Sequence, residues 1–137
     1  MNKKICIVNS NFYPKISKLL INSSIKTLKH NNYNNCKVFD VPGAFEIPIV
    51  ISSLIKKYDG FIALGCVIRG ETSHYNHLCD SIFNSIMQLN IKYKKPIGNG
   101  ILTCNNFNQA LYRANKKKSD KGSDAAKALI SVFKIIK

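Results

Sequence analysis

A histidine stands directly after a predicted strand-to-helix turn, in the segment Gly65–His74 (GCVIRGETSH). An apolar run ends in this segment, and a helical pattern begins near Thr72, which is a suitable N-cap residue. Unpaired backbone N–H groups at a helix start favour a bound anion. His74 falls on the first turn, and imidazole readily exchanges protons near neutral pH. The segment indicates an anion site beside a proton-transfer group, although a lone surface histidine is more often inert.

A second histidine, His77, follows His74 at a spacing that two metal ligands on a helix can also have. A metal site needs further ligands, and no Cys or His pattern in the sequence supplies them. We therefore expect no metal at these residues.

A second candidate segment is Val41–Pro48 (VPGAFEIP), which follows another apolar run. Gly43 permits a tight turn with the backbone close to a ligand. Phe45 offers a flat face to an aromatic ring, and Glu46 offers a carboxylate to hydroxyl or amino groups. The alternative is an ordinary helix start, where Glu46 would be favourable near the positive end of the helix dipole.

A third group of polar residues lies toward the C-terminal end of the sequence. Arg113 ends a short helical pattern, and its guanidinium could hold a phosphate through two hydrogen bonds. Lys121 is a cation at a flexible loop. Asp124, in the first turn of the last helix, could orient a histidine or interact only with the helix dipole. Each of these residues, taken alone, could equally be a solvated surface residue.

The remaining pattern alternates short apolar runs with helical stretches, which is typical of a parallel sheet covered on both faces. One α/β domain spanning residues 1–137 fits this pattern, and ligands of such sheets bind outside the carboxyl ends of the strands. The predicted strands are Lys4–Asn9, Cys36–Val41, Phe61–Ile68 and Pro96–Thr103. The first predicted helix begins at Pro14. The other predicted helices span Ala44–Lys57, Thr72–Leu89, Phe107–Ala114 and Ser123–Ile136.

The composition excludes several classes of protein. The net charge is +14, but Arg69 and Arg113 are the only arginines and the lysines are scattered, whereas nucleic-acid-binding proteins favour Arg and clustered cations. The abundance of Lys, Ile and Asn fits the codon bias of an AT-rich genome. The five cysteines form no CxxC pair and are expected to be buried thiols in a reducing cytoplasm. No apolar run is long enough to span a membrane.

Five segments of the chain, in order and at compatible spacing, resemble the hallmark motifs of the 6,7-dimethyl-8-ribityllumazine synthase family. The early Asn11-Phe12-Tyr13 is similar to the family's aromatic motif after its first strand. The resemblance implies a flavodoxin-like three-layer α/β/α sandwich with a four-stranded parallel sheet. The five segments are Val41–Pro48, Gly65–Tyr75, Pro96–Thr103, Gln109–Ala114 and Lys121–Ala126.

The resemblance also implies a reaction. 5-Amino-6-(D-ribitylamino)uracil would condense with 3,4-dihydroxy-2-butanone 4-phosphate to give 6,7-dimethyl-8-ribityllumazine, phosphate and water, without a metal or organic cofactor. In this assignment Phe12 stacks on the pyrimidine, Glu46 accepts hydrogen bonds from the ribityl hydroxyls, and Lys121 lies near the polar edge of the ring. The other residues implied to hold the ring and the ribityl chain are Ala44, Phe45, Val67 and Ile68.

The same resemblance assigns the phosphate and the proton transfers. The backbone N–H groups of Glu71 and Thr72 would bind the phosphate together with Arg113. His74 would move protons as the amine attacks the ketone and phosphate leaves. Asp124 would orient His74 or form a charge pair with it.

Asn99 departs from the family pattern, because many members carry an aromatic residue there that stacks on the substrate from a neighbouring subunit. An amide cannot stack in this way, but it could form a hydrogen bond to the ring. The resemblance implies a cytoplasmic homopentamer with active sites between subunits, and it makes riboflavin synthase a candidate partner. A multiple of pentamers stays open. The alternatives are a non-catalytic lumazine or flavin binder of the same fold and, more remotely, a basic nucleic-acid-binding protein.

Overall fold

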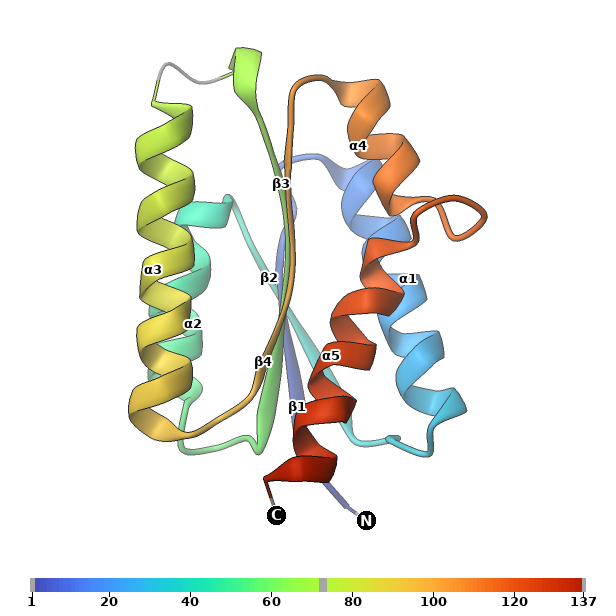
Figure 1. Ribbon diagram of the computed structural model, residues 1–137, viewed down its shortest axis with the longest axis vertical. Coiled ribbons are helices and arrows are strands. Elements are labelled where there is room, and N and C mark those ends of the chain that lie inside the picture. Colours follow the sequence, from blue (N-terminus) through green and yellow to red (C-terminus); the bar gives the residue numbers. More distant parts are fainter. Residues whose placement is uncertain (1, 72–73, 137) are drawn as a thin grey trace.

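Four apolar segments form a sheet in which all strands run parallel (Figure 1). The structure is a computed structural model that describes residues 2–71 and 74–136. The strand order is β2-β1-β3-β4. The strands are β1 (Ile5–Ser10), β2 (Cys36–Val41), β3 (Gly60–Ile68) and β4 (Ile97–Cys104).

The central strands β1 and β3 are buried along their whole length. β1 pairs with β2 from Ile5 opposite Cys36 to Ser10 opposite Val41, and it pairs with β3 on its other side. A strand with neighbours on both sides and helices on both faces has no solvent-exposed side chain, which explains the uninterrupted apolar runs in the sequence. The four predicted strands are thus confirmed, with each boundary within one residue of the predicted one.

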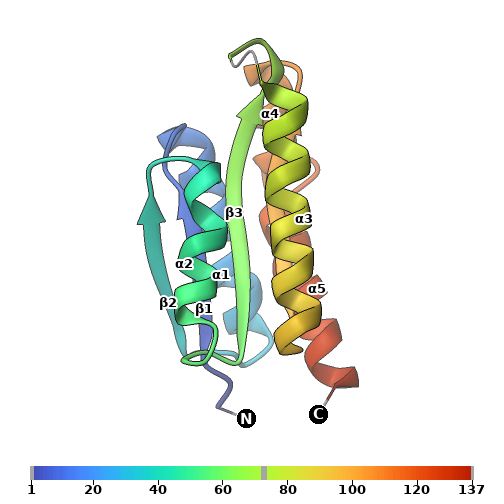
Figure 2. The same ribbon diagram turned by 90° about the vertical axis from the view of Figure 1, so that its left-hand side faces the viewer.

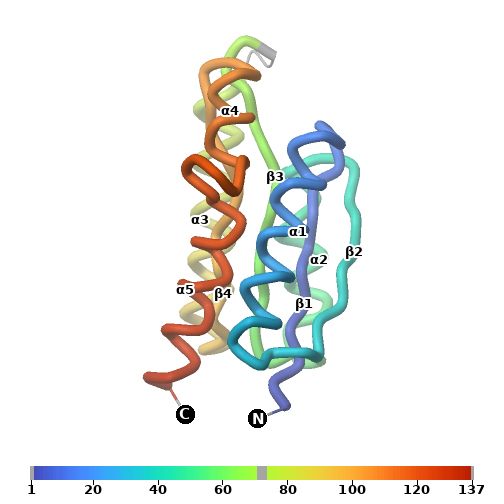
Figure 3. Tube along the Cα trace, turned by 90° about the vertical axis from the view of Figure 1, so that its right-hand side faces the viewer, coloured from blue at the N-terminus to red at the C-terminus, as the bar shows by residue number. Residues whose placement is uncertain are grey.

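Helices cover both faces of the sheet and complete a three-layer α/β/α sandwich, as predicted. On one face lie α1 (Pro14–His30), α4 (Phe107–Ala114) and α5 (Lys121–Ile135), which Figure 3 shows side by side. On the other face lie α2 (Ile47–Leu54) and α3 (Tyr75–Tyr93), which face the viewer in Figure 2. Each face buries its own apolar cluster against the sheet.

Two of the predicted helices begin later than expected. The stretch predicted as one helix from Ala44 starts with a 3₁₀ turn, η1 (Ala44–Glu46), and Pro48 then lies in the first turn of α2, where its missing N–H costs no hydrogen bond. A second 3₁₀ turn, η2 (Arg69–Glu71), follows β3. These short turns carry the chain away from each strand before the α-helix starts.

The N-cap of α3 is His74 rather than the expected Thr72, which itself lies outside the described residues. The helix also runs four residues past its predicted end at Leu89. It stops at Tyr93 because Lys94 adopts a left-handed conformation with φ of 51°. Leu89 and Tyr93 pack against the apolar cluster on this face, so the extra turn buries apolar surface.

Small residues bring α1 and α5 into close contact on the opposite face. The Ser24 hydroxyl donates a hydrogen bond of 2.7 Å to the Gly122 carbonyl. A Cβ atom on Gly122 would stand 2.5 Å from the Leu20 carbonyl oxygen, so the backbones touch where a side chain would not fit. This contact places the start of α5, with Lys121 and Asp124, against the middle of α1.

The five cysteines are free thiols; four of them are buried, as predicted, whereas Cys36 is half-buried. Within the described residues, no group of three His, Cys, Asp or Glu side chains is arranged to hold a metal ion. None of the described helices combines the length and the apolar character needed to cross a membrane.

Candidate functional site

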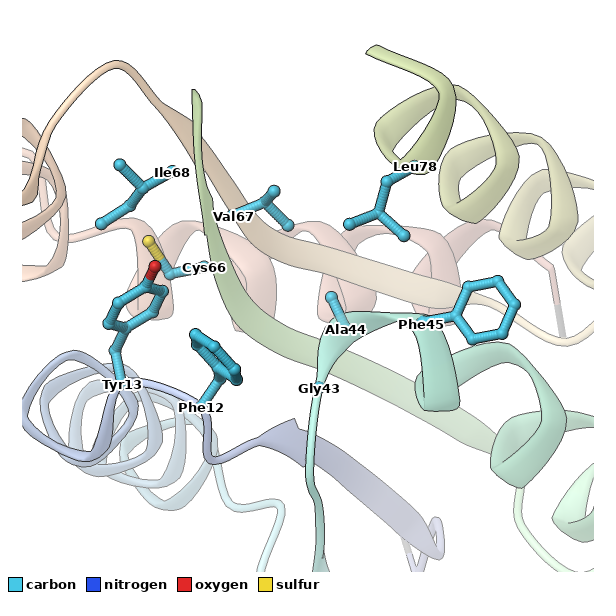
Figure 4. A pocket seen from close by; sticks show the side chains of 9 residues that line it. All are labelled: Phe12, Tyr13, Gly43, Ala44, Phe45, Cys66, Val67, Ile68 and Leu78. Carbon is cyan, nitrogen blue, oxygen red and sulfur yellow. The ribbon is translucent and has the colours of Figure 1, made fainter. Parts of the chain in front are cut away.

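A cavity of about 300 Å³ opens at the carboxyl ends of the strands, where ligands of parallel sheets bind. It straddles the end of β3: Phe12 and Tyr13 lie on one side of the strand, and Phe45 and Leu78 lie on the other (Figure 4). The lining residues come from the loop after β1, the turn after β2, the end of β3 and the first turns of α3. They are Phe12, Tyr13, Gly43, Ala44, Phe45, Cys66, Val67, Ile68 and Leu78.

Two phenylalanines border this cavity with most of their surface exposed. Phe12 is 62% exposed and Phe45 is 66% exposed, although large apolar side chains such as these usually lie in the core. Phe12 is held edge-on against Tyr13, with ring centroids 4.9 Å apart. Tyr13 in turn approaches Phe107 at the start of α4, at 6.2 Å. Exposed rings held at a cavity are suited to stacking on a flat aromatic ligand.

Five predicted substrate-binding residues meet in this cavity, and three further lining residues were missed. The five are Phe12, Ala44, Phe45, Val67 and Ile68. The missed side chains are Tyr13, Cys66 and Leu78. Tyr13 stands next to Phe12 in the motif, and Cys66 precedes Ile68 by two strand residues, which is the period that places side chains on one face.

Glu46 takes part in the turn that shapes the cavity. Its Oε1 accepts a hydrogen bond of 2.9 Å from the backbone N–H of Gly43. Glu46 therefore stabilises the start of the helix, which was the alternative interpretation of this motif. Its side chain faces a second hollow of about 280 Å³ between α2 and α3, which Phe45 also lines. Phe45 separates the two hollows.

His74 is exposed at the start of α3, one turn before the lining residue Leu78, whose backbone N–H donates to the His74 carbonyl at 2.8 Å. The nearby Arg69 has a structural role. Its Nε donates to Asn105 Oδ1 at 3.2 Å, and its guanidinium lies over the Tyr75 ring at 4.4 Å. These contacts tie the turn after β3 to the end of β4. Glu71 closes the η2 turn.

Six predicted site residues with described side chains do not line this cavity: Glu46, His74, Asn99, Arg113, Lys121 and Asp124. Asn99 is exposed on the edge strand β4, and its Oδ1 accepts from the Ile101 N–H at 3.0 Å. Lys121 Nζ lies 3.5 Å from Asp124 Oδ2. The predicted site is thus divided between the cavity and the β4–α4–α5 side of the molecule.

Arg113 reaches from α4 to the end of β4. Its Nη1 donates to the Thr103 carbonyl at 2.9 Å and to Cys104 Sγ at 3.6 Å. Cys104 also accepts a hydrogen bond from the Cys66 thiol. That bond and burial raise the pKa of Cys66. The same bond, with the positive charge of Arg113, lowers the pKa of Cys104 to about 7 despite its burial.

Known proteins match the whole described chain. The family model for 6,7-dimethyl-8-ribityllumazine synthase matches residues 2–137. A 6,7-dimethyl-8-ribityllumazine synthase of Limosilactobacillus reuteri is 38% identical over 134 residues, which cover 96% of this chain and 88% of the relative. The enzyme of the same name from Buchnera aphidicola subsp. Baizongia pistaciae is 38% identical over 139 residues, 98% of this chain and 87% of the relative.

A third relative gives the same result. The 6,7-dimethyl-8-ribityllumazine synthase of Desulfovibrio desulfuricans is 35% identical over 137 residues, 97% of this chain and 88% of the relative. These matches agree with the motifs, with the parallel sheet and with the aromatic cavity at its carboxyl edge. The chain belongs to the 6,7-dimethyl-8-ribityllumazine synthase family, and it is a transferase of riboflavin biosynthesis.

Proposed function

We propose that the cavity at the end of β3 binds 5-amino-6-(D-ribitylamino)uracil and that its condensation with 3,4-dihydroxy-2-butanone 4-phosphate takes place at the cavity mouth. The observation that carries this proposal is the pair of exposed rings, Phe12 and Phe45, at a cavity that Leu78 also lines, one helical turn after the exposed His74. Residues 1–137 act as one domain in this reaction. No metal or organic cofactor is needed, because the condensation is feasible once the two substrates are held together.

In this proposal the pyrimidine stacks on Phe12, and the apolar side chains Ala44, Val67 and Ile68 enclose the ring. The ribityl chain extends past Phe45 toward Glu46. Glu46 Oε1 is held by the Gly43 N–H, which orients the carboxylate and leaves Oε2 as the acceptor for a ribityl hydroxyl. The hollow of about 280 Å³ beside Phe45 and Glu46 gives this chain space.

The proton transfers are assigned to His74. The 5-amino group attacks the ketone carbon, and His74 passes protons between the amine and the departing oxygens as the imine forms and phosphate leaves. The exposed position of His74 at the helix start supports this role, because both substrates can reach it from solvent. The phosphate is bound by the backbone N–H groups of Glu71 and Thr72 and by Arg113.

We further propose that each active site lies between two subunits of a pentamer or a multiple of pentamers. The division of the predicted site supports this: Asn99, Arg113, Lys121 and Asp124 do not line the cavity of their own subunit. They would complete the cavity of a neighbour. Asn99 would then offer its amide N–H group to the ring, because its oxygen is occupied by Ile101. Lys121 and Asp124 would approach the pyrimidine edge and His74.

The product would be used in the cytoplasm by riboflavin synthase, which we propose as a partner. The first experiment mixes the purified protein with both substrates and follows the lumazine by absorbance and fluorescence. Product formation above the uncatalysed rate supports the proposal. A folded protein that binds the pyrimidine but gives only background product would instead be a non-catalytic binder.

A second experiment tests the division of the site between subunits. His74→Ala and Arg113→Ala subunits are unfolded together, reassembled as a mixture and assayed. If the two residues belong to sites shared between neighbours, some interfaces contain both intact residues, and part of the activity returns. A mixture no more active than the separately reassembled variants would mean that one subunit supplies both residues.

A further inference from the structure

Two thiols connect the wall of the cavity to the guanidinium of Arg113. In the register of β3 and β4, Cys66 is opposite Leu102 and Ile68 is opposite Cys104, so the two cysteines are diagonal neighbours on one face of the sheet. Cys66 lines the cavity (Figure 4) and is 6% exposed, whereas Cys104 is 1% exposed. The Cys66 thiol donates a hydrogen bond to the Cys104 sulfur.

The other partner of Cys104 is Arg113. Nη1 of this residue has two acceptors, the Thr103 carbonyl at 2.9 Å and Cys104 Sγ at 3.6 Å. Because the guanidinium is planar, fixing one amino group against two acceptors also fixes the directions of Nε and Nη2. The described residues form no hydrogen bond to Nε or Nη2, so these donors remain for a ligand.

We propose that Cys104 is a positioning residue for phosphate binding: its sulfur, itself held by Cys66, sets the plane of the Arg113 guanidinium. This inference rests on the proposed role of Arg113 in binding the ketone phosphate. A two-donor contact with a phosphate needs the guanidinium in one orientation, and the contact with the sulfur at the end of β4 holds it in that orientation.

The charge of the sulfur strengthens this contact. The hydrogen bond from Cys66 is the largest influence that lowers the pKa of Cys104, and Arg113 lowers it further, against the effect of burial. Cys66 on β3 and Arg113 on α4 are the described groups that shift the pKa of this sulfur. α1 and α5 pack on the same face of the sheet, and they bring no described charge close to it. A thiol with a lowered pKa ionises at a lower pH than an ordinary cysteine, so above the pKa of Cys104 the contact is a thiolate–guanidinium pair.

The test compares Cys104→Ala and Cys104→Ser with wild type, using Cys36→Ser as the control. Cys36 is a half-buried thiol at the opposite end of the sheet, on β2. We expect Cys104→Ala to raise the KM for the ketone phosphate about tenfold, since a hydrogen bond to a charged group is lost, with the KM for the pyrimidine within about twofold. Cys104→Ser keeps a small hydrogen-bond acceptor, so its KM for the ketone phosphate should lie between those of Cys104→Ala and wild type. An unchanged KM for the ketone phosphate, or equal increases in both KM values, would overturn the inference.

A spectroscopic titration tests the charge directly and does not depend on activity. The ultraviolet absorbance of thiolate, recorded from pH 5.5 to 8.5, should show a step near pH 7 in wild type and Cys36→Ser. The step should be missing in Cys104→Ser and should move to higher pH in Arg113→Gln. No step in wild type, or a step that persists in Cys104→Ser, would contradict the thiolate–guanidinium pair.

Arg113→Gln also separates this inference from the function on which it rests. If Arg113→Gln leaves the KM for the ketone phosphate unchanged, Arg113 does not bind the phosphate, and the proposed site is wrong at that point. If Arg113→Gln raises this KM and Cys104→Ala does not, the site is correct and Cys104 does not position the arginine.

Discussion

The ammonium of Lys121 lies 3.5 Å from the carboxylate of Asp124, one turn along the start of α5. Both side chains are about half exposed, at 46% and 54%, and an ion pair in such a position stabilises a fold by at most about 1 kcal/mol. The pair therefore contributes little to stability. Its effect is to hold two opposite charges together on a surface that we propose faces a neighbour's substrate.

His74 should be important for turnover and unimportant for folding. His74→Ala is expected to lower kcat by about 100-fold, because a positioned general acid–base is lost. The Kd for the pyrimidine, measured by fluorescence titration, should stay within about twofold, because stacking is left intact. His77→Ala is the matched control, since it removes an exposed histidine from the next turn of α3. An equal loss of pyrimidine binding in His74→Ala would mean that His74 has a structural role.

Phe12 should be important for binding and unimportant for stability. Phe12→Ala should weaken pyrimidine binding by about tenfold, since a stacked ring pair contributes up to about 1.5 kcal/mol. The exposed ring buries little surface in the free protein, so the urea midpoint should hardly change. Isothermal titration and urea unfolding measure the two quantities. Tyr112→Ala is the control, because it removes an exposed ring from α4, away from the cavity. Unchanged binding in Phe12→Ala would remove Phe12 from the proposed site.

The strands and one helix could be predicted closely from the sequence. β2 and α4 have the predicted bounds, because Pro42-Gly43 and Asn106 are strong local signals: Asn106 Oδ1 caps α4 by accepting from the Gln109 N–H at 2.8 Å. The start of α3 was misplaced by three residues, because His74 and not Thr72 is its N-cap. Its end was misplaced because the burial of Tyr93 depends on α3 packing against the sheet, which no local pattern shows.

The site could be predicted in its residue types but not in its arrangement. The family resemblance identified Phe12, and the turn motif after the second strand identified Phe45 by its aromatic ring. Leu78 was missed because a leucine at helical spacing is indistinguishable from a core residue. The contact between Arg113 and Cys104 was missed because it depends on how α4 lies across the end of β4, which only the tertiary structure shows.

Close contact between α1 and α5 makes Gly122 important for stability. Gly122→Ala places a methyl group 2.5 Å from the Leu20 carbonyl and should lower the free energy of unfolding by about 2 kcal/mol, as overpacking does. Gly70→Ala is the control, because a Cβ there meets no described atom within 4 Å. Urea unfolding of both variants measures the difference. Equal midpoints would mean that α5 can shift away from α1 without cost.

Stability should decrease in alkaline solution because the thiols of Cys6 and Cys36 must remain neutral in the folded protein. Burial raises the pKa of Cys6 to about 12 and that of Cys36 to about 11, from an ordinary value of 9.0. The two thiols therefore lose their protons at a lower pH in the unfolded chain than in the folded protein. The free energy of unfolding that is present below pH 9 is lost as the pH rises toward the pKa values of the folded protein. The urea midpoint should fall between pH 9 and 11, and it should fall less in Cys6→Ala. Parallel pH profiles for the variant and wild type would contradict this origin.

The bond from Ser24 to Gly122 joins residues 98 positions apart, and it has a consequence for biosynthesis. The apolar cluster beneath α1 includes Ile5 from the first strand and Phe133 from α5, which stacks on Tyr33. A nascent chain can therefore pair β1, β2 and β3 on the ribosome, but the part of one face that α5 covers stays exposed until α5 has left the exit tunnel. During that interval the exposed apolar surface makes the chain prone to aggregation.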